Sequence, residues 1–224
     1  MKNINVAHPP NIGWLEIELD KTEMDYLWKC IDNKGECNKK NLAGVNEGAY
    51  TLKDKDNWFL YNVIGKCIDA YQKGFGENRG QYVPNTVQHP IVLHHWWVNY
   101  MKQHDYNPCH LHKGLYSFVV WMKIPTEYKD QKQLPHAVTS RSESVSNFEF
   151  LYNNILGETK QCAYHMNKER EGQMLFFPSE LHHQVYPFYN CDEERISISG
   201  NIRIASDISI NDSRVVNTKS KGFK

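Results

Sequence analysis

The hydrophobic pattern of the chain changes its period near residue 91, and this change constrains the fold more than any other feature. Before it, apolar residues such as Met24, Leu27 and Ile31 recur every three to four positions, which is typical of amphipathic helices. After it, short segments are apolar at every second position, which is typical of strands with one buried face. Strands are expected at 91–100, 116–124, 148–152, 161–165, 173–177, 183–186 and 195–204. Helices followed by about seven short strands predict a mostly β domain of the α+β class, a sandwich or barrel backed by helices.

The first ninety residues are expected to support this β core. The alternating segment 14–19 predicts one strand, and Asp20 with Glu23 predicts a capping box that starts a helix ending at Gly35. A second helix is expected over 54–73, stopped by Gly74 and Gly76. Loops are expected at 38–50, 80–90 and 126–146, the last as a mobile rim loop. We therefore predict one domain over 1–224, with helical support and an N-terminal strand (1–90), a β core (91–204) and a tail (205–224).

Charge and composition exclude several classes of protein. Lysine plus arginine and aspartate plus glutamate number 26 each, which gives no electrostatic argument for a nucleic-acid partner. No run of about eighteen apolar residues predicts a membrane span, and the N-terminus lacks the apolar segment of a signal peptide. Six cysteines in a chain of this length do not predict a disulfide scaffold. We expect free thiols in the cytoplasm, because Cys30 and Cys37 also lack two further ligands for a zinc site.

Three histidines and one arginine have the spacing of a metal site. His110 and His112 are two residues apart, so in an extended segment both imidazoles lie on one face and can reach one ion. His183 follows the apolar segment 173–177, and Arg195 opens the last alternating segment. Imidazole suits iron, copper, zinc and nickel. Two near ligands, one distant ligand and a buried cation on the next strand are the pattern of a non-haem Fe(II) oxygenase.

Three motifs resemble Fe(II)/2-oxoglutarate-dependent dioxygenases. They are YMKQHDYNPCHLH (100–112), FPSELHH (177–183) and ERISISGN (194–201). The first is similar to the ligand segment of prolyl 4-hydroxylases. The chain also resembles small oxygenases of marine bacteriophages, which carry an Asn-Leu-Ala-Gly run like that at 41–44. The resemblance covers about 41–203 and implies a double-stranded β-helix (jelly-roll, cupin-like) core whose open mouth holds the metal.

The resemblance implies Fe(II) as the metal, with His110, His112 and His183 as its ligands. His182 is disfavoured because the FPSxLxH spacing leads to His183. His112 departs from the family, which usually has aspartate or glutamate there. A second register therefore stays open, in which His112 is the first ligand and Gly114 stands in the carboxylate position, as in oxygenases that leave room for a halide.

The resemblance also implies 2-oxoglutarate as cofactor. Arg195 is expected to bind its far carboxylate, because a guanidinium can bind a carboxylate with two hydrogen bonds. Ser197, on the same face of the strand, is expected to donate a second hydrogen bond, and Tyr100 aligns with a tyrosine that contacts this carboxylate. The competing interpretation of Arg195 is a surface ion pair with Glu193 or Glu194.

The implied activity is hydroxylation of a peptidyl or free proline-like substrate, with 2-oxoglutarate converted to succinate and CO₂. The partner is then a small molecule or peptide, neither nucleic acid nor membrane, and the sequence gives no oligomeric state. Substrate choice is expected in the loops 78–90 and 126–146. Two other classes stay open: a three-histidine metal dioxygenase that does not use 2-oxoglutarate, and a non-catalytic jelly-roll binding protein.

Overall fold

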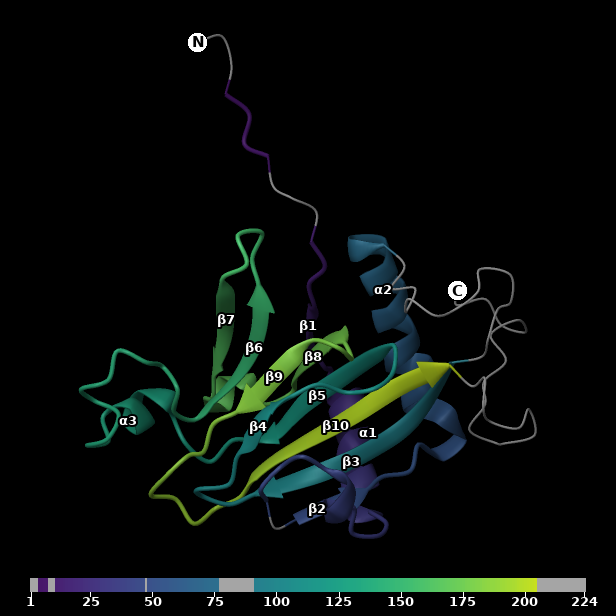
Figure 1. The fold of residues 1–224 in the computed structure, drawn as a ribbon. Coiled ribbons are helices and arrows are strands. Elements are labelled where there is room, and N and C mark those ends of the chain that lie inside the picture. Colours follow the sequence, from purple (N-terminus) through teal and green to yellow (C-terminus); the bar gives the residue numbers. More distant parts are fainter. Residues whose placement is uncertain (1–3, 8–10, 47, 77–90, 205–224) are drawn as a thin grey trace.

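The computed structural model describes residues 4–7, 11–46, 48–76 and 91–204, and in this part the chain forms two antiparallel sheets with helices against one of them (Figure 1). The larger sheet has the strand order β1-β8-β5-β10-β3-β2, and the smaller has the order β4-β9-β6-β7. The strands are β1 (Leu15–Glu18), β2 (Gly48–Thr51), β3 (Ile91–Met101), β4 (Asn107–His110), β5 (Tyr116–Lys123), β6 (Asn147–Asn153), β7 (Thr159–His165), β8 (Gln173–Pro178), β9 (His182–Val185) and β10 (Arg195–Ile204). The helices are α1 (Lys21–Asp32), α2 (Gly65–Phe75) and α3 (Tyr128–Lys132), with 3₁₀ turns η1 (Lys39–Asn41), η2 (Lys55–Asn57) and η4 (Lys168–Arg170) and a π-helical turn η3 (Leu60–Ile64).

Two apolar cores hold these layers together. The larger core fills the space between the helices and the six-stranded sheet, and it contains Leu27 of α1, Tyr71 of α2 and Phe176 of β8. The smaller core lies between the two sheets and contains Trp121, Phe150 and other large side chains. Antiparallel strands with both faces covered need apolar residues on both faces. The larger sheet therefore has a mostly apolar central strand, β5, whereas β10 also places Arg195, Ser197 and Asn201 in buried positions.

Strand β5 shows how the sequence produces this layering. Its residues are buried from Tyr116 to Met122 because one face meets the helices and the other meets the smaller sheet. Side chains alternate between faces along a strand. Phe118 and Val120 accordingly enter the helix-side core, whereas Val119 and Trp121 enter the core between the sheets.

The predicted helix–strand order is confirmed. Each of the seven strands expected after residue 90 is present with ends that shift by at most two residues. The expected hairpin is formed by β6 and β7, which pair antiparallel from Asn147↔His165 to Asn153↔Thr159. The capping box is also present, since Asp20 Oδ1 accepts from the Glu23 backbone at 2.8 Å and Glu23 Oε2 accepts from the Asp20 backbone at 2.9 Å.

Two strands were missed by the sequence pattern. The segment 38–50, expected as a loop, contains β2, which pairs with β3 at the edge of the larger sheet. Strand β4 lies within the motif segment 100–112 and pairs with β9 through Asn107↔Val185 and His110↔His183. Both strands have four residues, and β4 contains Pro108. Alternation over so few residues is too short to detect, and proline is tolerated because β4 is an edge strand.

The second helix also differs from the prediction. The region begins with η2 and η3 before α2, and Asp54 accepts from the backbone nitrogens of Phe59 and Leu60, both at 2.9 Å. Gly74 lies inside α2 and does not stop it. Gly76, with φ of +81°, is the residue that ends the helix. An open helix position tolerates glycine at a modest cost, so only the glycine with positive φ acts as a stop signal.

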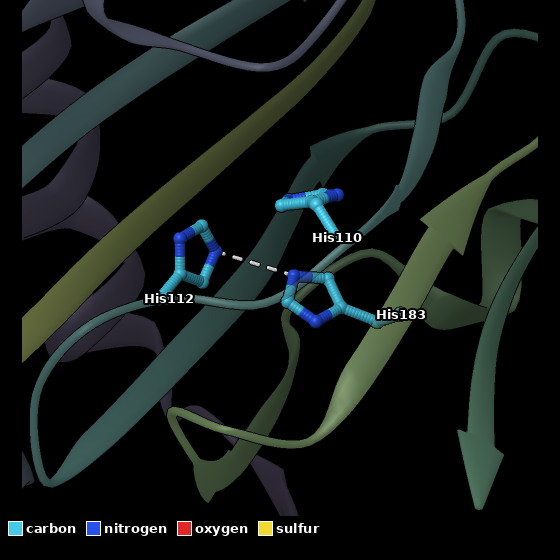
Figure 2. A group of neighbouring side chains, drawn as sticks. All are labelled: His110, His112 and His183. Atoms are coloured by element: carbon cyan, nitrogen blue, oxygen red, sulfur yellow. Dashed lines mark hydrogen bonds between the residues drawn. The ribbon is translucent and has the colours of Figure 1, made fainter.

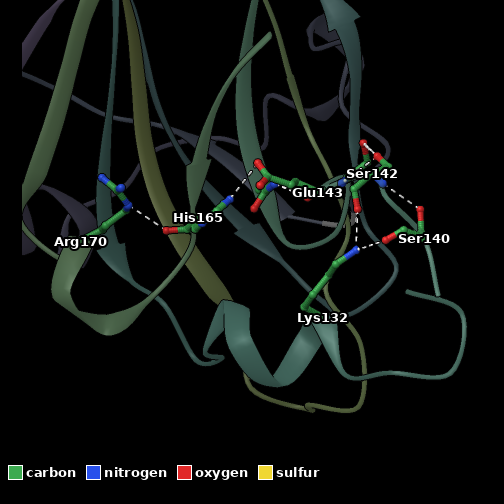
Figure 3. Close-up of polar contacts among 8 residues, drawn as sticks. Lys132, Ser140, Ser142, Glu143, His165 and Arg170 are labelled. Carbon is green, nitrogen blue, oxygen red and sulfur yellow. Dashed lines mark hydrogen bonds and ion pairs between the residues drawn. The ribbon is translucent and has the colours of Figure 1, made fainter. Parts of the chain in front are cut away.

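The segment 126–146 is structured, which corrects the expectation of a mobile rim loop. It contains α3, and Gln131 is buried with its amide nitrogen donating to the Tyr189 carbonyl at 2.9 Å. Lys132 Nζ donates to the carbonyls of Ser140 and Ser142 at 2.7 and 2.6 Å (Figure 3). It also donates to the Ala137 carbonyl at 3.0 Å. Because these three carbonyls bind one ammonium group, they order a segment that has no β-ladder of backbone hydrogen bonds. The expected loop 80–90 and tail 205–224 lie outside the described residues.

Candidate metal centre

The three predicted histidines come together at one end of the smaller sheet (Figure 2). His110 and His183 are direct partners on the paired strands β4 and β9. His112 follows β4, and its backbone nitrogen donates to the Ser179 carbonyl at 2.8 Å. Direct partners on adjacent antiparallel strands have side chains about 5 Å apart on one face. The pairing of β4 with β9 thus brings residues from two distant parts of the sequence into one cluster.

The geometry of the cluster fits one metal ion. One ligand nitrogen from each of His110, His112 and His183 lies within 4.8 Å of the other two, and Nε2 of His183 lies 3.2 Å from Nε2 of His112. His110 Nδ1 donates to the Pro108 carbonyl at 2.7 Å, and His183 Nδ1 donates to the Leu181 carbonyl at 2.8 Å. An imidazole whose Nδ1 carries the proton presents a lone pair on Nε2. These backbone bonds therefore preset two rings as metal ligands.

Burial keeps the three rings neutral. It lowers the pKa of His110, lowers the pKa of His112 to about 4 and lowers the pKa of His183 well below its ordinary value. Repulsion from nearby histidines adds to burial in each case. It comes from His182 for His110, from His110 for His112, and from His110, His112 and His182 for His183. A metal ligand must be deprotonated. Protons therefore compete with a metal ion for these nitrogens only at pH values below the ordinary pKa of imidazole.

Two neighbouring residues stand apart from the cluster. His182 is exposed on β9, whereas His183 is 5% exposed and packs against the ring of Phe148. Gly114 lines a different cavity, and a Cβ built on it would lie 2.7 Å from the Ile202 carbonyl of β10. The cluster that the structure forms contains His110, which is the first ligand in the primary register and has no role in the halide-type register.

The cavity next to the histidines also contains Arg195. This side chain is 2% exposed; its Nη2 donates to Ser146 Oγ at 2.7 Å, and its guanidinium lies 4.8 Å from the ring centre of Phe188. Its Nε is buried without a hydrogen-bond partner. Glu193 pairs instead with Lys123 at 2.7 Å, which removes it from the competing interpretation of Arg195 as a surface ion pair.

The electrostatics of Arg195 favour an anionic ligand. Burial lowers the pKa of Arg195 to about 9, so the guanidinium still carries its charge at neutral pH. An uncompensated buried charge costs several kcal/mol. No carboxylate among the described residues pairs with Arg195. Ser197, two residues further on β10, lines the same cavity with Ser199. A carboxylate entering this cavity would meet a guanidinium and hydroxyl donors, which fits the far end of 2-oxoglutarate.

Tyr100 does not fit its predicted role. It lies on the face of β3 that packs against the helix-side core, and its ring contacts Tyr50 and lies 5.6 Å from Lys34 Nζ. The alternation of β3 places its neighbour Asn99, together with Trp97, in the wall of the histidine cavity. Trp97 Nε1 donates to Asn99 Oδ1 at 3.1 Å.

Sequence reasoning missed two further polar residues of this cavity, Asn46 and Asn107. Asn46 is 3% exposed, and neither atom of its amide has a hydrogen-bond partner; Asn107 Oδ1 is likewise buried and unpaired. Buried polar groups are rarely unsatisfied unless a ligand or water completes them. The only signal in the sequence was the Asn-Leu-Ala-Gly run at 41–44, which precedes Asn46 and contributes three residues to the cavity wall.

Comparison with known proteins finds a family similar to the part of the chain that contains this site. A family model described as "Putative 2OG-Fe(II) oxygenase" matches residues 95–201, which include all three histidines and Arg195. Residues 95–201 are thus similar to a 2OG-Fe(II) oxygenase domain. The protein is therefore an oxygenase enzyme, and the cofactors of its family are Fe(II) and 2-oxoglutarate. No curated protein sequence matches the chain.

Several solved structures are similar to this chain. A 2OG-Fe(II) oxygenase-family oxidoreductase from Burkholderia pseudomallei has a TM-score of 0.51 at 10% identity, covering 82% of this chain and 80% of that one. A prolyl-4-hydroxylase from Pseudomonas putida has a TM-score of 0.49 at 13% identity, covering 86% and 93%. A prolyl hydroxylase from Trichoplax adhaerens, in complex with a hypoxia-inducible-factor peptide fragment, has a TM-score of 0.45 at 12% identity, covering 85% and 82%. The Burkholderia match and the two facing sheets show the double-stranded β-helix fold of this oxygenase.

Two further expectations can be compared with the structure. All six cysteines are free, as predicted. Within the described residues, none of the helices combines the length and the apolar character needed to cross a bilayer.

Proposed function

We propose that this oxygenase is a hydroxylase in which His110, His112 and His183 hold Fe(II), while Arg195 and Ser197 hold the far carboxylate of 2-oxoglutarate. One observation carries the proposal: a buried arginine without a carboxylate partner lines the same cavity as three neutral imidazoles that can share one ion. Without an anionic ligand, the buried charge of Arg195 costs free energy. Without a metal ion, the three neutral imidazoles have nothing to coordinate.

In the proposed site, some residues orient the histidine rings, and others exclude water from the cavity. The Pro108 and Leu181 carbonyls hold Nδ1–H of His110 and His183, so that Nε2 of each ring stays available. Trp121, Phe148 and other apolar side chains form the cavity wall and keep water away from bound reactants. When bound, Fe(II) and 2-oxoglutarate would supply the oxidising chemistry with O₂, of which one oxygen atom would enter succinate, with release of CO₂, and the other a C–H bond of the substrate.

A proline-like substrate, peptidyl or free, is the finer part of the proposal. Its support is the resemblance of 100–112 to the ligand segment of prolyl 4-hydroxylases. The single-domain organisation over 1–224, the likeness to bacteriophage oxygenases and the cytoplasmic location also stay predictions.

Consumption of 2-oxoglutarate tests the proposal directly. Purified protein with Fe(II) and ascorbate should form succinate, and His110→Ala should abolish this activity together with iron binding. The matched control is His182→Ala, which removes an exposed histidine of β9 and should leave both unchanged. Full activity of His110→Ala would contradict the assignment.

A three-histidine dioxygenase that does not use 2-oxoglutarate is the second candidate, and the absence of a carboxylate from the cluster favours it. His112→Asp separates the two. In a 2-oxoglutarate enzyme this change creates the two-histidine, one-carboxylate set that Fe(II) oxygenases commonly use, so iron binding and part of the succinate formation should persist. Oxygen uptake that is independent of 2-oxoglutarate and lost in His112→Asp would support the alternative.

A further inference from the structure

A second cavity, of about 260 Å³, adjoins the histidine cluster. It shares His110, His112 and Trp97 with the cavity that contains Arg195, so both cavities reach the same histidines. The proposed function assigns the Arg195 cavity to 2-oxoglutarate. The second cavity is then the route by which the substrate to be oxidised approaches the metal.

The charged groups that line this second cavity are cationic. They are Lys113 and Arg203, and no aspartate or glutamate lines the cavity. Within the described residues neither side chain forms an ion pair. Arg203 Nε donates to the backbone carbonyl of Lys113 at 3.1 Å, which brings the two residues together. Two neighbouring cations without a counterion repel one another, and an anion between them would remove that cost.

A neutral donor accompanies the two cations. Asn201 lines the same cavity and is almost fully buried. Its amide oxygen accepts from Ser117 Oγ at 2.7 Å, and Ser117 Oγ is in turn 2.9 Å from Ser179 Oγ. The amide oxygen is therefore committed to the protein, and the amide nitrogen is the part of Asn201 that remains to donate to a ligand.

The backbone of the segment with Lys113 is fixed against β10, so Lys113 leaves the chain at a defined place beside Arg203. Leu115 donates its backbone N–H to the Ile202 carbonyl at 2.8 Å. Gly114, which lies between Lys113 and Leu115, has φ of +150°. A Cβ on Gly114 would lie 2.7 Å from the Ile202 carbonyl. Only glycine permits this approach. A fixed backbone lowers the entropy that a ligand must remove in order to bind both side chains.

We infer that the substrate carries an anionic group, a carboxylate or a phosphate, which Lys113 and Arg203 bind while the rest of the substrate extends toward His110 and His112. This inference rests on the proposed function, because it takes the Arg195 cavity as the site of 2-oxoglutarate. It adds an anionic group to the proposed substrate, a property that the resemblance to prolyl 4-hydroxylases does not specify.

Anion binding to the protein loaded with Fe(II) and 2-oxoglutarate, without oxygen, tests the inference. Acetate and methyl phosphate are the probes, titrated by calorimetry, and bound 2-oxoglutarate blocks Arg195. The double variant Lys113→Gln/Arg203→Gln should weaken binding of the preferred probe by about tenfold or more, as expected for charge-assisted hydrogen bonds. Wild-type affinity should also fall as salt increases. Whichever probe binds more tightly shows whether the group is a carboxylate or a phosphate.

Control variants separate recognition from structural damage. Lys66→Gln removes an exposed positive charge from α2 and should leave both titrations unchanged. Arg203→Lys keeps the charge and should retain part of the affinity. The double variant should keep wild-type affinity for 2-oxoglutarate. Equal binding of both probes to wild type and double variant, or no binding of either to wild type, would overturn the inference.

A second assay uses substrate-stimulated succinate formation. Candidate substrates are supplied as free acids or phosphates and as their methyl esters, and only the charged forms should stimulate the wild type. Stimulation by esters as strong as that by acids would reject the anionic class while leaving the oxygenase intact. Failure of the proposed function would look different, because the wild type would then form no succinate from 2-oxoglutarate under any condition.

Discussion

Arg195 is the residue at which ligand binding and fold stability oppose each other. Its guanidinium is buried, charged at neutral pH and without a carboxylate partner. The hydrogen bond from Nη2 to Ser146 and the contact with the ring of Phe188 offset only part of the desolvation cost. The metal-free, cofactor-free protein therefore carries an energetic cost that binding of a carboxylate would relieve.

Arg195→Met should separate these two effects. Removing the charge while keeping the volume should leave the Tm of the ligand-free protein unchanged or higher, because replacing buried charges by apolar groups is often neutral or stabilising. Affinity for 2-oxoglutarate should fall by roughly 2–5 kcal/mol, with iron binding retained. Thermal unfolding and calorimetric titration measure both.

Arg170→Met is the control for Arg195→Met. Arg170 is partly buried, but it donates to the His165 carbonyl at 2.8 Å (Figure 3) and its guanidinium carbon lies over the ring of Tyr164. These contacts compensate the charge of Arg170, so Arg170→Met should lower the Tm without changing the affinity for 2-oxoglutarate. A lower ligand-free Tm for Arg195→Met than for Arg170→Met would contradict the account of Arg195.

His183 and His110 should respond differently to truncation. Both alanine variants should lose iron, measured as metal content per protein. His183 is buried against Phe148 and Phe177, so His183→Ala should also cost roughly 2–4 kcal/mol in urea unfolding, as expected for removal of a buried ring. His110 is half-buried, and His110→Ala should cost clearly less. Equal losses of stability would show that the packing of His183 contributes little.

At the scale of elements, the short strands and the rim segment position the site. Strand β4 is only four residues long, yet its pairing with β9 joins His110 to His183. The segment 126–146 ends beside β6, and its Ser146 accepts from Arg195. A segment expected as a loop thus holds Arg195, which lines the cavity next to the histidines. Its order depends on Lys132, which three backbone carbonyls surround.

Lys132→Met should loosen the segment 133–146. Three carbonyls would lose a charged donor, and each charge-assisted hydrogen bond contributes about 1.5–3 kcal/mol before solvent replaces it. Hydrogen exchange of backbone amides in this segment should become faster, while exchange in β5 and β10 should not change. Lys129→Met, at an exposed position of the same helix, is the matched control. Unchanged exchange in the Lys132 variant would mean that other contacts order the segment.

At the scale of the whole molecule, one sheet serves two cores, and the metal site lies where the two sheets face each other. Helices α1 and α2 cover the far side of the larger sheet (Figure 1), so the site depends on the packing of the smaller sheet. Burial of the three histidines in this position couples the site to the stability of the metal-free fold. This coupling makes the stability of the metal-free protein depend on pH.

Stability of the metal-free protein should fall in mild acid. In the unfolded chain the histidines have a pKa of about 6.5. In the fold the pKa of His112 is lowered to about 4, and those of His110 and His183 are also lowered. Between these values the unfolded state binds more protons, so stability is greatest above pH 6.5 and is lost as pH falls toward 4. His112 alone would account for about 3 kcal/mol at the acid limit.

Urea unfolding of the metal-free protein at pH 7.5, 6.5, 5.5 and 4.5 measures this loss. His112→Gln should flatten the dependence, whereas His182→Gln, at an exposed position, should not. The affinity for iron should change little between pH 8 and 6, because the three histidines of the folded protein bind protons only at lower pH. A pH dependence in His112→Gln equal to that of wild type would remove His112 from the explanation.

The sequence by itself determined the order of elements and the identity of the chemical groups. The switch of hydrophobic period predicted the helices and seven strands, because burial of one face imposes periods of 3.6 and 2 on any chain. The spacing of His110, His112 and His183 and the strand opened by Arg195 predicted a cluster that the structure forms. These features are local or follow from a known motif.

Only the tertiary structure decided which faces meet. It placed Tyr100 away from the site and Asn99 in it, because the pairing of β3 within the sheet fixes which side of the strand faces the histidines. It also revealed the unpaired Asn46 and the adjacent cations Lys113 and Arg203, which come from segments far apart in the sequence. Contacts between distant segments are set by strand register and by packing of whole layers, and neither is encoded in a local pattern.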